Sequence, residues 1–473
     1  MSSSELISLG AREAVAKLRE GEITPLDLID AAEQRIAAVD PTVNALPTLC
    51  LDMARDEAKA LQKPDNPGPG WLAGLPIVVK DVTEVAGVRT THGSPIFADH
   101  ISTHDDLSVE ILKRNGAIVI GKSNTPEFAA GANTFNEVFG KTLNPWNTGM
   151  TCGGSSGGAA VAVATGMSWL ATGTDLGGSL RTPASFCSVV GLRPSPGRVS
   201  GGPARDPFQS LSMNGPIARD VADVALMLDA EVGGDPRNPL ALEAPAQSFQ
   251  AAATHPRTPT RIGFTPDLGI GPVDPEVAEI CAAGTARFAE SGAVVEAASP
   301  DFSGALETFQ TLRAAAFVVN RAPLLENHRD KMKPEMIWNI EKGMAQTSGD
   351  VARAQLERGA LYQRVADWFE DYDVLACPAA IVPPFDVDMR YLERVGDHEF
   401  GNYVDWLYIT FAITLTGCPA ISVPCGFTKS GLPVGLQLVG RPRGEAELLS
   451  YAARFEEIVD IASRVPIDPR PGL

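Results

Sequence analysis

The stretch Gly153-Gly154-Ser155-Ser156-Gly157-Gly158-Ala159-Ala160 is the most unusual part of this 473-residue sequence. Its four glycines and two serines lead directly into a run of small residues that predicts a helix over 159–166. A helix N-terminus presents free N–H groups, and glycine lets a ligand or another backbone approach closely. The stretch therefore predicts either a chemical site or a tightly packed turn without chemistry.

Two known motifs fit this stretch poorly. A phosphate-binding loop needs Lys followed by Ser or Thr after its last glycine, where this chain has Ala159-Ala160. The nucleophile elbow G-x-S-x-G matches residues 153–157 literally, but it needs an Asp and then a His downstream. The three downstream histidines, His255, His328 and His398, have no distinctive setting. Both interpretations are therefore disfavoured.

Two further segments belong with the first one. The segment Gly173-Thr174-Asp175-Leu176-Gly177-Gly178-Ser179-Leu180-Arg181 has consecutive glycines before a serine. Such glycines can turn successive N–H groups toward one point, which is the geometry that an oxyanion needs. Upstream, Lys80 stands at the end of the apolar run 74–79, where a solvated surface lysine would be out of place. An ordinary ion pair of Lys80 with Asp81 or another acid is the alternative.

The remaining pattern predicts a mixed α/β fold, because strand-like and helix-like segments alternate from Leu75 onward. The first forty residues predict two helices, and Thr24-Pro25 has the residue types of a helix start. Region 305–370 predicts mostly helix, and region 233–259 a long surface excursion. The other expected elements are strands at 77–79, 117–120, around Cys377, at 421–423 and 434–439, and helices at 108–113, after 124–127 and at 445–458.

Composition narrows the classes of function. Hydrophobic residues make up 44% and charged residues 21%, as in globular proteins, and the net charge is -19. That charge disfavours nucleic acid and anionic membrane surfaces and favours an uncharged or cationic small substrate. Seven cysteines without a C-x-x-C pair argue against a disulfide framework or a zinc finger. The first residues lack the features of a secretory signal, which predicts a cytoplasmic protein.

Together the three segments resemble the amidase signature family of serine hydrolases, in its stand-alone bacterial form. The resemblance covers residues 12–460 and includes the stretches 214–223 and 417–437. Ser155 and Ser179 are 24 residues apart, as the two serines of the family motifs are. One departure is Ala159, which stands where many members have Ser.

The resemblance implies a fold and a domain organisation. We expect a single α/β domain over 1–473, with a mixed, mostly parallel central sheet covered by helices on both faces. Within it, the N-terminal helical arm would span about 1–62 and the signature core about 70–225. A more helical, substrate-shaping part would span about 300–415.

The resemblance also implies a mechanism. Lys80 would take a proton from Ser155, Ser155 would take one from the nucleophile Ser179, and Ser155 would follow a cis peptide bond with Gly154. This is the chemistry of an amidase, which hydrolyses the C–N bond of small amides, and it extends to aryl amides, carbamates and esters. No metal and no cofactor is expected. The implied oxyanion hole consists of the N–H groups of Leu176, Gly177, Gly178 and Ser179, and the supporting residues are Gly154, Ser156, Asp175 and Arg181.

Several alternatives stay open from the sequence. Trp338, Tyr403 and Trp406 lie in aromatic-rich stretches that predict either a substrate pocket or helix core packing. The chain has the residues of the glutaminase component of a glutamyl-tRNA amidotransferase as well, or of a non-catalytic scaffold, and a homodimer is favoured over a monomer. His104-Asp105-Asp106 is interpreted as a helix cap rather than a metal cluster. Cys152 is interpreted as a packing residue rather than a thiol nucleophile.

Overall fold

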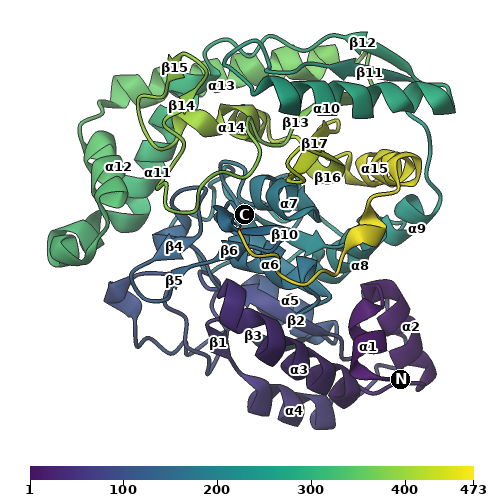
Figure 1. The fold of residues 1–473 in the computed structure, drawn as a ribbon. Helices are drawn as coiled ribbons and strands as arrows, with labels where there is room; N and C mark the ends of the chain where they lie inside the picture. The colour runs from purple at the N-terminus through teal and green to yellow at the C-terminus, as the bar shows by residue number, and fades with distance from the viewer. Residues whose placement is uncertain (473) are drawn as a thin grey trace.

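An eleven-stranded sheet runs through the centre of the molecule (Figure 1). The structure is a computed structural model that describes residues 1–472. In spatial order the strands are β1 (Thr48–Leu49), β3 (Ile118–Ser123), β2 (Pro76–Lys80), β8 (Leu170–Asp175), β10 (Met213–Ala218), β9 (Val190–Arg193), β16 (Ala420–Phe427), β17 (Pro433–Val439), β13 (Val374–Pro378), β11 (Arg261–Phe264) and β12 (Val294–Ala297). Three small hairpins lie outside it: β4 (Phe135–Asn136) with β5 (Gly140–Lys141), β6 (Leu143–Asn144) with β7 (Asn147–Thr151), and β14 (Arg394–Val395) with β15 (His398–Glu399).

Helices flank this sheet, and the helical segment predicted for 305–370 consists of α11, α12 and α13, at one end of the molecule (Figure 1). The helices are α1 (Ser3–Ser8), α2 (Ala11–Glu20), α3 (Pro25–Val43), α4 (Leu51–Ala60), α5 (Leu107–Arg114), α6 (Gly157–Ala164), α7 (Arg181–Cys187), α8 (Val221–Glu231), α9 (Phe249–Thr254), α10 (Pro275–Ala286), α11 (Ala305–His328), α12 (Pro334–Met344), α13 (Ser348–Trp368), α14 (Tyr408–Thr416) and α15 (Glu445–Val459). Within residues 1–472, no helix is long and apolar enough to cross a membrane.

The sheet is mixed, as predicted, but the expectation that it is mostly parallel is wrong. Strand β2 runs parallel to both β3 and β8, and β11 runs parallel to both β12 and β13. The other six pairings of the described sheet are antiparallel. The alternation of strands and helices that suggested crossovers is clearest around 76–123. Strands β16 and β17, in contrast, are joined by the short loop 428–432, which permits only antiparallel pairing.

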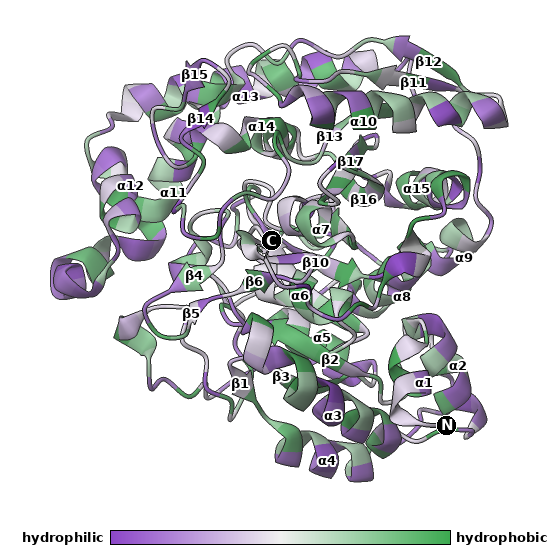
Figure 2. Cartoon of the chain, viewed as in Figure 1, coloured by the Kyte–Doolittle hydropathy of each residue, from purple (hydrophilic) through white to green (hydrophobic). Residues whose placement is uncertain are grey.

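Strand β2 explains why an apolar run ends in a lysine. All five residues of Pro76–Lys80 are buried, because the strand has a neighbour on each side and helices over it. Figure 2 shows hydrophobic colour along the inner strands, whereas outer helices such as α3 and α4 carry both colours. A strand buried in this way contains few polar residues. Lys80 is therefore delivered into the interior at the carboxyl end of β2.

Two predicted helical segments differ from the structure. The first forty residues form three helices rather than two, because Gly10 interrupts the chain and the buried Asp223 carboxylate accepts the N–H groups of Ala11 and Arg12 at 2.6 and 2.8 Å. The segment after 124–127 forms only the three-residue 3₁₀ helix η2 (Glu127–Ala129). Phe128 and Ala129 have φ angles of 51° and 57°, which an α-helix does not accommodate.

Candidate active site

Lys80 is wholly buried and is surrounded by hydroxyl groups. Its Nζ donates to Ser155 Oγ at 2.6 Å, to Ser156 Oγ at 2.8 Å and to Thr174 Oγ1 at 2.9 Å. Among the described residues, no carboxylate oxygen lies within ion-pair distance of this nitrogen. Burial lowers the pKa of Lys80 well below its ordinary value of 10.5, although the nearby charge of Asp175 opposes that shift. The group thus lies in a setting that favours its neutral form.

The alternative ion pair between Lys80 and Asp81 is absent from the described structure. Successive side chains of an extended chain point to opposite faces, so Asp81 points away from Lys80. Its carboxylate accepts hydrogen bonds from Thr91, through the backbone N–H at 3.2 Å and the hydroxyl at 2.5 Å. The charge that opposes the shift of Lys80 is therefore that of Asp175, not that of Asp81.

The loop carrying Ser155 is packed too closely for larger residues. The Gly154–Ser155 peptide bond is cis, as the resemblance implied. A Cβ atom on Gly157 would lie 2.2 Å from Thr134 Oγ1, and one on Gly158 would lie 2.4 Å from the backbone N of Asn124. Every residue of the helix α6 that follows is buried. The glycines of the motif therefore serve close packing, which fixes the loop against its neighbours.

Ser179 lies directly after β8 and faces the same cavity as Ser155. The two loops are joined by a hydrogen bond from the N–H of Ser156 to the carbonyl of Ser179 at 3.2 Å. Of the four N–H groups expected to bind an oxyanion, that of Gly178 instead donates to Asp175 Oδ1 at 3.0 Å. No described residue accepts the N–H groups of Leu176, Gly177 or Ser179. Three of the four amides are thus available to a ligand in the cavity.

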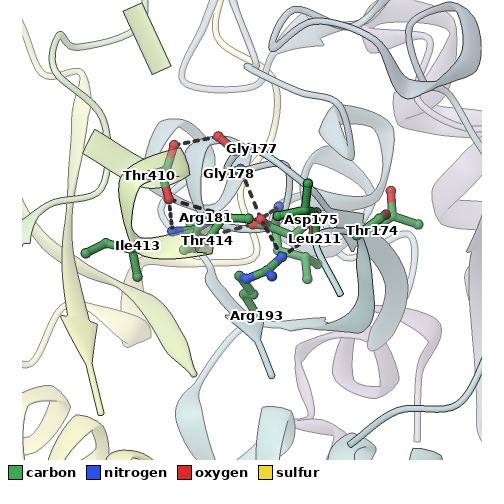
Figure 3. A network of polar contacts seen from close by, with 12 residues as sticks. Thr174, Asp175, Gly177, Gly178, Arg181, Arg193, Leu211, Thr410, Ile413 and Thr414 are labelled. Carbon is green, nitrogen blue, oxygen red and sulfur yellow. Dashed lines mark hydrogen bonds and ion pairs between the residues drawn. The ribbon is translucent and has the colours of Figure 1, made fainter. Parts of the chain in front are cut away.

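Asp175 is the centre of a buried polar network that supports this loop (Figure 3). Arg181 donates from Nε and Nη2 to its two carboxylate oxygens at 3.0 and 2.8 Å, and Arg193 Nη1 lies 3.3 Å from Oδ1. Burial alone would raise the pKa of Asp175, but the charges of Arg181 and Arg193 hold it well below its usual range. The carboxylate is therefore ionised, and it fixes both arginines beneath the loop.

The same network reaches two distant parts of the chain. Arg181 Nη1 donates to the carbonyl of Thr410 at 2.8 Å and to Gln437 Oε1 at 2.6 Å. Thr410 Oγ1 in turn donates to the carbonyl of Gly177 at 2.6 Å, as Figure 3 shows. The supporting roles predicted for Asp175 and Arg181 are consistent with these contacts. The sequence analysis missed Arg193, although a cation at the end of the buried strand β9 is the same signal that singled out Lys80.

The cavity in front of the two serines has a volume of about 320 Å³. Tyr403 lines it, but the other two predicted pocket residues do not. Trp406 is buried with its ring 5.6 Å from that of Phe385, and Trp338 is partly exposed and packs edge-on against Tyr403. For these two tryptophans, packing is the correct interpretation. The wall that the sequence analysis missed is one face of α11, which contributes Phe309, Arg313, Ala316, Phe317, Asn320 and Arg321.

The remaining candidates have structural explanations. Asp106 caps α5 by accepting the N–H of Ser108 at 2.9 Å, and Asp105 is paired with Lys113. Throughout residues 1–472, no group of three or more potential metal ligands is found. Cys152 is fully buried, and burial raises the pKa of its thiol to about 12, which opposes formation of a thiolate nucleophile.

Comparison with known proteins agrees with this geometry. Residues 27–449 match the family model described as Amidase. An acylamidase of Rhodococcus erythropolis is 36% identical and aligns over 99% of each chain. The amidase-type component of a glutamyl-tRNA(Gln) amidotransferase from Moorella thermoacetica is 37% identical, over 98% of this chain and 99% of its own.

A solved structure is similar as well. The crystal structure of a bacterial aryl acylamidase of the amidase signature family superposes with a TM-score of 0.88 at 26% identity, covering 97% of this chain and 99% of that one. The family match extends over most of the sequence and includes Lys80, Ser155 and Ser179. The chain therefore belongs to the amidase family and is a hydrolase of carbon–nitrogen bonds.

Proposed function

We propose that this protein is a stand-alone amidase that hydrolyses small amides through an acyl ester on Ser179. The observation that carries the proposal is the 2.6 Å contact between Lys80 Nζ and Ser155 Oγ, behind a cavity that Ser155 and Ser179 both line. A serine hydroxyl must lose its proton as it attacks, so it needs a base within reach. A buried lysine without a counterion is such a base.

Each proton has a defined path in this mechanism. The hydroxyl of Ser156 donates to the carbonyl of Thr174 at 3.3 Å, so toward Lys80 it acts as an acceptor. Neutral Lys80 can then donate to Ser156 while its lone pair accepts the proton of Ser155. Ser155 takes the proton of Ser179, whose Oγ attacks the amide carbonyl. The proton passes to the departing amine, and water then hydrolyses the acyl ester to release the acid.

The oxyanion of the tetrahedral intermediate is stabilised by backbone amides in this proposal. The N–H groups of Leu176, Gly177 and Ser179 are the free donors at the cavity wall. Amides fixed before the reaction stabilise developing charge without reorganisation. The bond from the N–H of Gly178 to Asp175 holds the turn in place instead of meeting the substrate. We therefore assign the oxyanion hole to three amides and a positioning role to Gly178.

The cavity favours an apolar or aromatic substituent on the substrate. Phe128, Phe309, Phe317 and Leu407 line it together with Tyr403. Aryl amides are therefore the preferred substrate class, and carbamates and small esters are further candidates because the acylation chemistry is the same. The lining of the cavity argues against the glutaminase alternative. Free glutamine carries an ammonium group, and Asp206 is the single carboxylate among the described lining residues.

A fluorophosphonate probe tests the proposal. We expect labelling of a single serine, identified as Ser179 by peptide mapping, and loss of both labelling and anilide hydrolysis in Ser179→Ala. His398→Ala, a change at an exposed residue outside this cavity, is the control and should leave both intact. Labelling of Ser155 in the Ser179→Ala protein would contradict the assignment. Glutaminase activity of the purified chain without anilide hydrolysis would favour the amidotransferase alternative.

The homodimer and the cytoplasmic location stay predictions. The amphipathic N-terminal helices, which suggested an interface, have buried residues that pack within the chain itself, such as Leu6, Val15 and Leu28. Their apolar faces are thus not what a second copy would cover. Light scattering at micromolar concentration gives the mass directly, and a monomer would contradict the homodimer.

A further inference from the structure

The α11 wall of the cavity carries two arginines that have no carboxylate partner. Arg313 and Arg321 both line the cavity, and neither forms an ion pair with any residue of the described chain. Arg313 donates instead to neutral groups, the hydroxyl of Tyr403 at 2.7 Å and Oδ1 of Asn339. Arg321 donates to the carbonyl of its neighbour Asn320 at 3.3 Å. Two cations thus face a cavity in a protein whose net charge is -19.

Aromatic rings hold both guanidinium groups. That of Arg321 lies 4.6 Å from the centre of the Phe128 ring, and that of Arg313 lies 4.4 Å from the Phe317 ring. Stacking of this kind stabilises a guanidinium while its edge N–H groups remain able to bind a ligand. Burial lowers the pKa of Arg321 to about 10, with a smaller contribution from the charge of Arg205. The group therefore remains protonated at neutral pH.

The acids near this wall leave Arg321 unneutralised. Asp206 lines the same cavity, but its Oδ1 accepts the N–H of Phe208 at 3.2 Å within its own loop. Glu127 precedes Phe128, yet its carboxylate accepts hydrogen bonds from Ser94 Oγ at 2.7 Å and from the N–H of Lys333 at 2.9 Å. No described carboxylate forms an ion pair with the Arg321 guanidinium. An unpaired, largely buried guanidinium is costly unless an anion arrives.

The position of Arg321 along α11 separates it from the reacting bond. Phe309, near the start of the helix, lies beside the nucleophile loop, since a Cβ on Gly177 would be 3.4 Å from Phe309 Cζ. Arg321 lies twelve residues further, which is about 18 Å along the helix axis. Helical side chains lean toward the N-terminus, here back toward the loop. A substrate that reaches both places needs an extended body between its two ends.

We infer that Arg321 binds a carboxylate at the far end of the substrate, so that the preferred amides carry an anionic group separated from the scissile bond by an apolar chain or ring. This inference rests on the proposed function and narrows its substrate class. It also reverses the expectation, drawn from the net charge, of an uncharged or cationic substrate. The local field of the two arginines, rather than the charge of the whole chain, acts on a molecule inside the cavity.

Binding to an inactive protein tests the inference without turnover. In Ser179→Ala, calorimetry compares the half-amides succinamic, adipamic and suberamic acid with the corresponding diamides and with the half-amide methyl esters. We expect the longer half-amides to bind about tenfold more tightly than their diamides and esters, because a carboxylate–guanidinium contact is a charge-assisted hydrogen bond. Equal affinities for acid, ester and diamide at every length would overturn the inference, and this comparison does not depend on whether an arginine variant folds.

Variants then assign the effect to Arg321. Arg321→Gln, in the Ser179→Ala background, should remove the preference for the acid, whereas Arg321→Lys should keep part of it. Arg329→Gln is the matched control, because Arg329 lies on the next turn of the chain and is exposed and paired with Glu341 at 2.7 Å. A preference that survives in Arg321→Gln would overturn the assignment.

Turnover by the wild-type protein separates this inference from the proposed function. Release of ammonia from half-amides and diamides at equal rates, without a preference in binding, would keep the amidase proposal and refute the subsite. Tight binding of half-amides without release of ammonia would keep the subsite and refute the amidase proposal.

Discussion

Asp175 and Arg181 form a two-point ion pair in which both side chains are completely buried, with Nε–Oδ2 and Nη2–Oδ1 distances of 3.0 and 2.8 Å. The pair connects the turn that precedes Ser179 to the helix that follows it, because Asp175 ends β8 and Arg181 begins α7. The same carboxylate also accepts the N–H groups of Gly178 and Leu180. The loop geometry therefore depends on one ionised side chain.

Asp175→Asn should destabilise the protein by about 3–5 kcal/mol, because it leaves Arg181 and Arg193 buried without their counter-charge. Urea unfolding measures this loss. Asp350→Asn is the control, since Asp350 is paired with the exposed Arg353 at the protein surface and its removal should cost less than about 1 kcal/mol. An unchanged urea midpoint for Asp175→Asn would refute the central role of the carboxylate.

Replacement of Lys80 should distinguish a base from a mere positive charge. Both Lys80→Ala and Lys80→Arg should lose most anilide hydrolysis, because a guanidinium stays protonated and cannot accept the proton of Ser155. Lys59→Arg, at an exposed position of α4, should keep wild-type rates. Near-normal turnover by Lys80→Arg would exclude the proton relay.

The pH dependence of turnover follows from the direction of the Lys80 shift. The neutral form is the active one, so kcat/KM should rise with pH through the pKa of Lys80 and then level off. Because burial lowers that pKa well below 10.5, the plateau should begin below the pH at which a free lysine titrates. A rate profile that rises only above the free-lysine value would contradict the burial argument.

Two adjacent glycines should respond differently to alanine. Gly178 has a φ of 119°, and a Cβ there would lie 2.3 Å from Thr410 Oγ1, so Gly178→Ala should strongly reduce both stability and turnover. At Gly177 the nearest atom to a new Cβ is Phe309 Cζ at 3.4 Å, an ordinary contact. Gly177→Ala should therefore fold with a similar Tm. Equal loss of Tm in the two variants would be inconsistent with these contacts.

Glu231, at the end of α8, should make stability fall as pH rises. Burial raises its pKa to about 8, and no described residue hydrogen-bonds to its carboxylate oxygens. Between its unfolded pKa near 4.5 and about 8 the folded state holds the extra proton, so stability declines with pH over that window, by at most about 5 kcal/mol. Glu231→Gln should raise Tm at pH 8 and have little effect at pH 4.5. A Tm unchanged by Glu231→Gln at pH 8 would contradict this.

The sequence predicts the chemical centre better than the surroundings. Lys80 was recognisable because an apolar strand ends in a cation, and the two serines because glycine-rich turns precede helices. The lining of the cavity was not recognisable, because α11 and the segment around Tyr403 meet only in the tertiary structure. Aromatic density in the sequence cannot separate Tyr403, which faces the cavity, from Trp406, which packs in the core.

The sheet was predicted in type but not in direction, for a similar reason. Local periodicity shows that β16 and β17 are strands, but strand direction depends on which neighbours they find. Strand β9 pairs with β10 on one side and with β16 on the other, and the second pairing joins residues more than 200 positions apart. Such contacts leave no periodic signal in a single sequence.

The two walls of the cavity come from separate parts of the chain, and this has a consequence for how its selectivity can change. Residues between Lys80 and Arg181 supply the proposed bond-breaking groups, whereas α11 meets the rest of a bound molecule. Within the described chain, no α11 side chain hydrogen-bonds to Lys80, Ser155 or Ser179. Substitutions along that one helix face can thus diversify the range of accepted amides, by mutation or by design, without rebuilding the apparatus that cleaves them.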